Sequence, residues 1–390
     1  MIMKKNLFKS LLTICALGAI FAACSNEGNE VPDVKKGEKS VFMKLDFQSS
    51  GGTRTTESAY NVTTAVNVQN FHVYFHDNAN ILKYVKIDGS TSITLQNLKD
   101  GTKIADVPAT ATHVTVYGNI PTTTSVPTAG TVANLKNVEI NIISQSDMTN
   151  ILLSGQDKAL TDYTGPTPPT WAPAIQNGDK YAEVEIAPAV SRIEIEGLET
   201  TATSAVQSFT LDGIYVNNFF EKFKLDDTSV GTQVQYGATP GNYAQGQGLY
   251  TISNLGKLFD EPASASVGNP AAVSPTGTPD PRWTYQVAPI SNNTDVNKQL
   301  QLVFKLSNLQ AKPSSGITFA AGNQFITVRG FKDNLGNIVK LEKGKIYTIS
   351  KADFKFDESN LSTVPNTNAV GVWLKVTVKN WQVVAVKPNL

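Results

Sequence analysis

The sequence predicts an all-β protein that is long enough for two domains of ordinary size. Its 390 residues are rich in glycine, serine, threonine, asparagine and β-branched residues, and it has no long alanine-, leucine-, glutamate- and lysine-rich segments of helical period. Several segments alternate apolar and other residues, as strands with one buried face do. Charged residues make up 17% of the chain, with 33 basic and 33 acidic side chains. Nucleic acid is therefore not expected as a partner.

Residues 1–23 have the pattern of a lipoprotein signal peptide. Three lysines precede the apolar stretch 11–21, and Ala23 stands directly before Cys24,. Cleavage between Ala23 and Cys24 would leave an N-terminal thiol that can be acylated. The alternative is a plain secreted protein with a leftover thiol. Cys15, the only other cysteine, would leave with the signal, so the mature chain cannot form an internal disulfide.

The polar residues 24–39 predict a flexible tether, and a strand is expected to follow at the start of the N-terminal domain (residues 40–187). In this strand one face is predicted to be buried and the other to be largely solvated. The loop after it reads Ser-Ser-Gly-Gly-Thr-Arg-Thr-Thr (residues 49–56) and places Arg54 where little can protect it,. A strand joined to the body through such a loop could be removed by a protease. The inward side chains are expected to be Val41, Met43, Leu45 and Phe47.

The rest of the first half shows further strand and turn signals. Residues 132–144 fit a short helix or a strand, and both readings stay open. The proline-rich segment 154–180 predicts a long surface loop near the domain junction, and Pro188 marks the domain boundary because proline cannot donate to a sheet. The other expected strands are 66–74 and 81–87 as a hairpin, 92–98, 112–119, 151–153, 181–187 and 191–197.

The second half, residues 188–390, repeats this pattern. The segment 228–282 is rich in glycine, serine and proline and is expected to be an exposed insertion. The tail, residues 370–390, could extend for roughly 70 Å as a strand, farther than one compact domain needs. It fits either an ordinary final strand or a strand given to another molecule. Strands are expected at 208–219, 300–306, 324–331, 338–341 and 345–356, and the tail's apolar positions are Val370, Val372, Leu374, Val376, Val378, Trp381 and Val383.

Signals for catalysis or metal binding are weak. His72 and His76 are about 13 Å apart along a strand, which is too far to share one ion, and they are expected to be solvated, as is His113. The carboxylate pairs 183/185 and 194/196 alternate with apolar residues, so the solvated face of a strand explains them without glycosidase chemistry. Motifs for phosphate, zinc or calcium sites and for a serine nucleophile are missing. We therefore expect no enzymatic activity and no cofactor.

Taken together, these features resemble the fimbrillins, the lipoprotein pilins of Bacteroidales type V pili. The resemblance covers nearly the whole mature chain as a pattern: a lipidation site, a tether, a first strand with an arginine loop, two β-rich halves and an apolar C-terminal strand with tryptophan. The segments that carry it are 41–55, 70–75, 114–119, 188–197, 214–216, 345–356 and 374–386.

The resemblance implies two tandem transthyretin-like β-sandwich domains and assembly by donor-strand exchange. The precursor would be lipidated at Cys24 and would reach the outer membrane. An arginine-specific surface protease would then cut between Arg54 and Thr55 and release the first strand. The tail of a neighbouring subunit would fill the groove, in a homo- or hetero-polymer that forms an extracellular fimbrium.

The sequence is also compatible with two other functions. A monomeric surface lipoprotein could bind glycan or a host protein, as a pilus-tip adhesin or a glycan-capture protein, and exposed Trp171 and Trp283 would suit that role. A glycoside hydrolase is the remote alternative.

Overall fold

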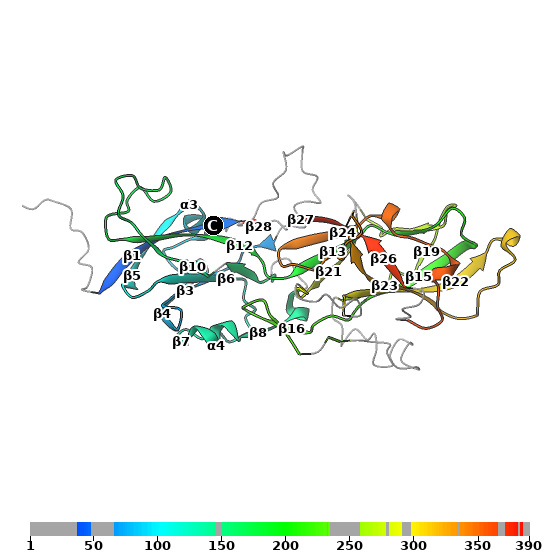
Figure 1. Cartoon of the computed structure of the whole chain (residues 1–390), viewed down its shortest axis with the longest axis horizontal. Coiled ribbons are helices and arrows are strands. Elements are labelled where there is room, and N and C mark those ends of the chain that lie inside the picture. The colour runs from blue at the N-terminus through cyan, green and yellow to red at the C-terminus, as the bar shows by residue number, and fades with distance from the viewer. Residues whose placement is uncertain are drawn as a thin grey trace, which may run out of the picture.

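The protein is built almost entirely from strands. The computed structural model describes residues 37–47, 66–145, 150–155, 157–231, 233–234, 258–277, 281–290, 298–333, 335–365, 371–380 and 383–384. Within these residues there are two short α-helices, α3 (Leu95–Asp100) and α4 (Val132–Lys136). The prediction of an all-β fold is therefore confirmed. Figure 1 shows an elongated molecule in which the N-terminal half and the C-terminal half follow one another along the long axis.

The N-terminal half is organised around one large, mostly antiparallel sheet. In spatial order the sheet contains β5 (Thr102–Pro108), β1 (Glu38–Phe47), β12 (Lys180–Pro188), β9 (Leu153–Gly155), β6 (His113–Gly118), β3 (Phe71–His76), β4 (Asn80–Ile87) and β7 (Gly130–Thr131). Two further short strands join this sheet: β10 (Lys158–Ala159) pairs with β6, and β11 (Thr161–Asp162) pairs with β12.

The C-terminal half contains a six-stranded and a four-stranded sheet, with a smaller three-stranded sheet beside them. The six-stranded sheet contains β18 (Phe259–Asp260), β15 (Val206–Asn217), β22 (Gln301–Ala311), β23 (Gln324–Lys332) and β26 (Val372–Lys375), with β19 (Ser264–Ala265) on β15. The four-stranded sheet contains β21 (Trp283–Val287), β13 (Ser191–Ile195), β24 (Lys345–Ile349) and β27 (Thr377–Asn380). The three-stranded sheet contains β20 (Ala272–Val273), β14 (Leu198–Thr200) and β25 (Lys355–Phe356).

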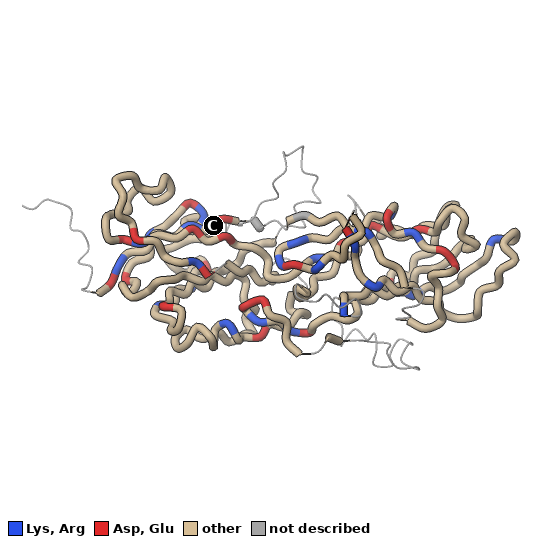
Figure 2. The backbone as a smooth tube through the Cα atoms, in the orientation of Figure 1, with Lys and Arg blue, Asp and Glu red and all other residues tan. Residues whose placement is uncertain are grey.

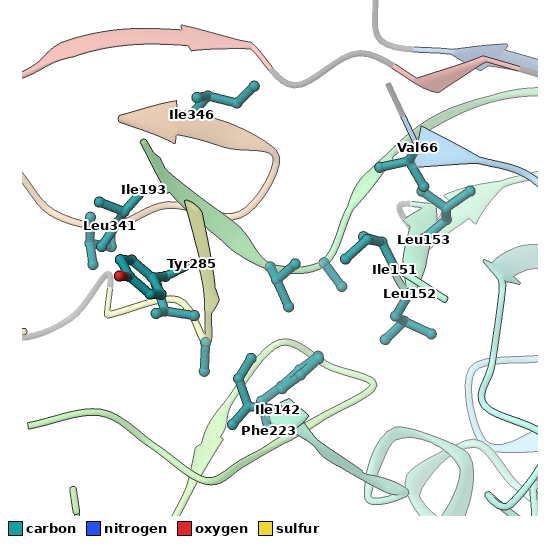
Figure 3. Close-up of a cluster of buried hydrophobic side chains, with 14 of the residues drawn as sticks. Val66, Ile142, Ile151, Leu152, Leu153, Ile193, Phe223, Tyr285, Leu341 and Ile346 are labelled. Carbon is teal, nitrogen blue, oxygen red and sulfur yellow. The ribbon is translucent and has the colours of Figure 1, made fainter. Parts of the chain in front are cut away.

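The chain crosses from the first half to the second between Pro188 and Ser191, but other elements also join the halves. In a three-stranded sheet, β8 (Glu139–Asn141) of the N-terminal half pairs with β16 (Lys222–Lys224), which pairs in turn with β17 (Ser229–Val230). Figure 3 shows Ile142, from the 3₁₀ helix η1 (Ile142–Gln145), beside Phe223 of β16. One continuous cluster of buried side chains therefore extends through both halves.

Alternation explains many of the strands. In β12 every second side chain, from Ala182 through Val184 to Ile186, is buried, while Glu183 and Glu185 are exposed. This is the period of two that a half-buried strand requires, and it confirms the solvated position of the 183/185 carboxylate pair.

Aromatic rings fill the core of the C-terminal half, where the Phe304 and Phe354 rings meet edge to face with 4.8 Å between centroids.

The strand predicted over 92–98 is wrong, because this segment leads into α3. The Thr94 hydroxyl accepts a hydrogen bond from the Asn97 N–H, and the Asn97 side chain accepts from the Thr94 N–H. This reciprocal cap satisfies two backbone donors at the helix start and favours a helical turn over a strand. Leu95 and Leu98 then face the core from the same side of the helix,.

Two other segments differ from or refine the predictions. Residues 132–144 contain both open alternatives, since α4 is followed by β8 and η1. The described parts of the 228–282 insertion are not simply exposed: β18 and β19 extend the six-stranded sheet, and Leu258, Ala271 and Val273 are buried. The remaining 3₁₀ helices are η2 (Pro313–Ser315), η3 (Lys351–Asp353) and η4 (Glu358–Asn360).

Candidate strand-exchange site

The first strand, β1, lies inside the large sheet. Along residues 41–47 it pairs in parallel with residues 180–186 of β12, and on its other side it pairs antiparallel with β5. In the described part of the chain β5 has no other sheet partner. Loss of β1 would therefore leave unpaired backbone groups on both neighbours. We call the space that β1 occupies between β5 and β12 the β1 slot.

The inner face of β1 contributes to the main core. Val41 and Met43 are completely buried and Leu45 is 1% exposed. Phe47, at the end of the strand, is partly buried and lies against Phe71, with 6.1 Å between the ring centroids. The side chains that the sequence pattern assigns to the inner face thus lie on one side of β1, against the core.

The outer face of β1 is not as solvated as the sequence predicts. Phe42 is only 5% exposed and forms a separate apolar cluster with Tyr163, Ala172 and Ile175, against which Trp171 and Tyr181 pack. Residues 161–179, which we call the strap, supply most of this cluster. The expectation of a surface loop agrees with the many irregular, exposed residues of this segment. Its expected place near the domain junction is wrong, because the segment packs on the outer face of β1. Its aromatic and proline content is the sequence signal that could have indicated such packing.

Ion pairs join the strap to two strands of this edge, and the strap also approaches Gly101, the residue before β5. Asp162 forms ion pairs with Lys39 of β1 at 3.9 Å and with Lys180 of β12 at 3.4 Å. Next to β5, Gly101 has a φ of +98°, and a Cβ at this position would lie 2.5 Å from the Trp171 carbonyl oxygen. Only glycine combines this backbone angle with so close an approach. The base of the strap is closed by hydrogen bonds between Tyr163 and its C-terminal end at residues 178–179.

A charged pair fixes the middle of the slot. Lys44, on the outer face of β1, donates a hydrogen bond of 2.5 Å to the Glu183 carboxylate of β12. This hydrogen bond raises the pKa of Lys44. Lys44 and Glu183 are direct neighbours in the strand register, so the pair favours one alignment of β1 along β12.

The tail folds onto its own chain in this structure. Strand β26 adds in parallel to β23 at the edge of the six-stranded sheet, and β27 adds antiparallel to β24 at the edge of the four-stranded sheet. Up to residue 380, the described tail thus consists of two short strands in different sheets. Leu374 and Val376 are buried, Val372 is partly buried and Val378 is 45% exposed.

Beyond β27 the chain returns to the N-terminal half. There β28 (Val383–Val384) pairs with β2 (Val66–Asn67). The placement of β26 and β27 is that of ordinary final strands, and the donor role of the tail stays a prediction. Several predicted site residues lie outside the described residues: Ala23, Cys24, Arg54, Thr55, Val370 and Trp381.

Two of the three histidines, His72 and His76, are not solvated as predicted, whereas His113 is partly exposed. His72 is 7% exposed and its Nδ1 lies 2.9 Å from the Tyr84 hydroxyl. His76 is completely buried, with Nε2 at 3.0 Å from the Thr115 hydroxyl and 3.3 Å from an Asp157 carboxylate oxygen. Both side chains lie on a strand whose two faces are covered. Burial lowers the pKa of His72 to about 4 and also lowers that of His76.

In the second carboxylate pair, Glu194 is also not solvated as predicted, whereas Glu196 is partly exposed. Glu194 is completely buried and accepts from Arg192 Nε at 2.9 Å and from Arg282 Nη1 at 2.6 Å. Arg282 also reaches Glu196 at 2.9 Å. Buried carboxylates need such partners, so this cluster has a structural explanation.

Other kinds of site find no support in the described residues. Within those ranges, no group of three or more histidine, cysteine, aspartate and glutamate side chains could hold a metal ion. A search of the same ranges found no helix long and apolar enough to cross a membrane. Figure 2 shows basic and acidic residues interspersed along both halves.

The architecture is that of fimbrilins and related cell adhesion proteins of Bacteroidales. A candidate cell adhesion protein from Bacteroides eggerthii matches with a TM-score of 0.50 and 14% identity, over 92% of this chain and 100% of that one. A fimbrilin from Porphyromonas gingivalis matches with a TM-score of 0.50 and 11% identity, over 89% of this chain and 98% of that one. No family profile and no curated protein sequence matches the chain. At the level of the fold, these structures agree with the resemblance found in the sequence.

Proposed function

We propose that this chain is a structural subunit of a cell-surface fimbria, a type V pilus, and that its subunits polymerise by strand exchange. The observation that carries the proposal is the position of β1. It is the first strand in the described part of the chain, it lies between two neighbours, its inner face is buried, and Phe42 on its outer face is buried as well. Removal of β1 would leave a slot between β5 and β12 that another strand can fill. The fold shared with a fimbrilin supports the same conclusion.

The energetics favour refilling the slot. Burial of Val41, Met43 and Leu45 stabilises the half by about 1.5–3 kcal/mol for each side chain, or roughly 5–9 kcal/mol together. An empty slot would expose that apolar surface and the backbone edges of β5 and β12. Such an edge is a template for a strand from another chain. A donated strand would recover both contributions, although ordering a free tail costs conformational entropy.

Export and processing complete the proposed pathway. Cys24 would be acylated, and the lipid would anchor the precursor in the outer membrane until an arginine-specific protease cuts after Arg54. The other arginines of the mature chain are poorer targets. Arg192 and Arg329 lie within β13 and β23, where paired backbone cannot enter a protease cleft without local unfolding. Arg282 is held by the Glu194 and Glu196 carboxylates.

The alternative of a monomeric glycan- or host-protein binder gains no support from the tryptophans. Trp283 lies in β21 and is 8% exposed, so the expectation that it is exposed in a loop is wrong. Trp171 is partly buried in the strap and packs against Tyr181, with 6.3 Å between the ring centroids. Neither ring offers the open stacking face that the alternative needs.

The proposal is tested with purified full-length lipoprotein and an arginine-specific protease. We expect cleavage between Arg54 and Thr55, followed by a ladder of oligomers that resist SDS. Arg54→Lys keeps the positive charge but removes the cleavage site, so this variant should stay monomeric. Thr53→Ser, which leaves Arg54 in place in the same loop, is the matched control and should assemble like the wild type. Assembly of Arg54→Lys at the wild-type rate would show that strand release at this position is not the switch.

A further inference from the structure

The first strand and the tail share a pattern at seven consecutive positions. Residues 41–47 read Val-Phe-Met-Lys-Leu-Asp-Phe, and residues 372–378 read Val-Trp-Leu-Lys-Val-Thr-Val. Apolar residues occupy the same four alternate positions in both. Between them, both segments carry an aromatic residue, then a lysine, then a polar residue that can face water. Alternation alone requires only the four apolar positions, so the match at the other three is additional information.

We propose that the tail of a second copy of this chain enters the β1 slot in this register, with Trp373 in the place of Phe42 and Lys375 in the place of Lys44. The inference rests on the proposed function, because the slot is open only after β1 has left. It goes further by naming the alignment and the two outward side chains that select the incoming strand.

The strap explains why an outward aromatic residue is needed. Tyr163, Ala172 and Ile175 form the apolar cluster in which Phe42 of β1 packs, and we call the space that the Phe42 ring occupies in this cluster the strap pocket. A strand with a small or charged residue here would leave this pocket empty or bury an unpaired charge. The larger ring of Trp373 can be accommodated because the neighbouring side chains, Trp171 and Tyr181, are only partly buried. The strap therefore acts as a second specificity pocket, on the face opposite the main core.

The lysine position gives charge complementarity in the same register. Glu183 pairs with Lys44 when β1 is present, and it would be left without that partner after β1 leaves. In the described structure Lys375 pairs with Asp353 at 3.3 Å. On moving to the slot, Lys375 would exchange this carboxylate for Glu183. A shift by two residues would instead put Trp373 or Thr377 opposite Glu183.

The positions of the two segments suit a head-to-tail assembly. Figure 1 shows β1 beginning at one end of the molecule and running towards its middle. Ser362, in the described residues before the tail, bridges to Phe325 near the start of β23 in the C-terminal half, and Figure 1 shows that half at the other end of the molecule. To reach another copy, the tail would have to leave β23 and β24 and also β2 of its own N-terminal half, with which β28 pairs. It can enter the slot of the next copy parallel to β12, as β1 does.

The tail can leave its own half without breaking the interior of a sheet. Both β26 and β27 are edge strands with one partner each. Trp373 lies against Gly330, where a Cβ would come within 2.8 Å of the indole ring, and beneath the ammonium group of Lys332 at 5.3 Å from the ring centroid. In its own half Trp373 is therefore partly buried against β23, and its proposed place in the polymer is beside Tyr163, Ala172 and Ile175 in the strap pocket.

The register is tested by cysteine pairs in the full-length chain. Processing after Arg54 also removes Cys24, so the processed subunit has only the cysteines that are introduced. Direct neighbours on adjacent strands are about 4.8 Å apart and can form a disulfide, whereas positions displaced by two residues are about 8 Å apart and cannot. The in-register pairs are Lys375→Cys with Glu183→Cys and Thr377→Cys with Glu185→Cys. The matched off-register control is Lys375→Cys with Glu185→Cys.

After processing and mild oxidation, we expect both in-register variants to give covalent ladders that survive boiling in SDS without reductant. The off-register control should give SDS-resistant polymer that boiling dissociates. Polymers that cross-link only through the off-register pair, or through none, would overturn the register and leave the proposed function intact. A chain that is processed but never polymerises would instead overturn the proposed function, and the register with it.

Discussion

Gly101→Ala should loosen the strap without changing β1 itself. Gly101 has a φ of +98°, and a Cβ there would lie 2.5 Å from the Trp171 carbonyl oxygen and 2.7 Å from the indole ring. Gly130 has the same φ of +98° and nothing within 4 Å of a Cβ, so Gly130→Ala is a matched control. The backbone angle costs both variants about 1–2 kcal/mol. Only Gly101→Ala adds a steric cost, which is about 1–3 kcal/mol for an overpacked site.

Hydrogen exchange of the β1 amides in the uncleaved chain measures this difference. An additional 1–3 kcal/mol corresponds to opening that is roughly 5- to 150-fold more frequent. We expect this acceleration in residues 38–47 of Gly101→Ala and not in those of Gly130→Ala, which lies at the opposite edge of the sheet. Equal exchange of β1 in the two variants would refute the role of the strap in holding the strand.

Three other predictions concern the tail, the lipid and acid stability. Deletion of residues 371–390 removes the buried Leu374 and Val376 from two sheet edges, which should lower the free energy of unfolding by about 3–6 kcal/mol. The variant should not polymerise, although circular dichroism should still show a cooperative melt of β-sheet structure. A molten product would contradict a donor role for the tail. Cys24→Ala should take up no radiolabelled palmitate, since no other cysteine survives in the mature chain, and labelling of this variant would exclude the lipoprotein assignment. The pKa of His72 in the folded protein is about 4, below its ordinary 6.5, so the folded state favours the neutral ring. The free energy of unfolding should therefore fall by up to about 3 kcal/mol as the pH drops from 6.5 to 4. The variant His72→Gln, which cannot titrate, should lose correspondingly less stability over this range.

Alternation within a single strand predicts which of its side chains face the core and which face solvent. Alternation in β1 and β12 is sufficient to assign Met43 and Val184 to the core and Glu183 to solvent. It does not reveal what covers the second face of a strand. Phe42 is buried by a segment that lies more than a hundred residues away in the sequence, and no local pattern carries that information. Glu194, in a similar alternating strand, is buried because two arginines compensate its charge.

The local signals also have limits within short segments. The stretch before α3 looks like a strand by its β-branched residues, but the reciprocal cap between Thr94 and Asn97 decides for a helix. The histidines of β3 depend on elements elsewhere in the sequence in the same way as Phe42. The processing residues Cys24 and Arg54 lie outside the described residues, and their roles stay predictions.

The sheet that joins the two halves has a mechanical consequence for a fibre. If subunits form a linear polymer, tension would have to pass through every subunit from one end to the other. The peptide link at residues 189–190 would not carry this load alone, because β8 and β16 are hydrogen-bonded across the same junction and Lys222 pairs with Glu139 at 3.0 Å. A further ionic contact joins Asp227, in the turn between β16 and β17, to Lys343, in the connection between β23 and β24. Parallel load paths of this kind would stiffen each subunit against bending and would shift extension under force to the joints between subunits.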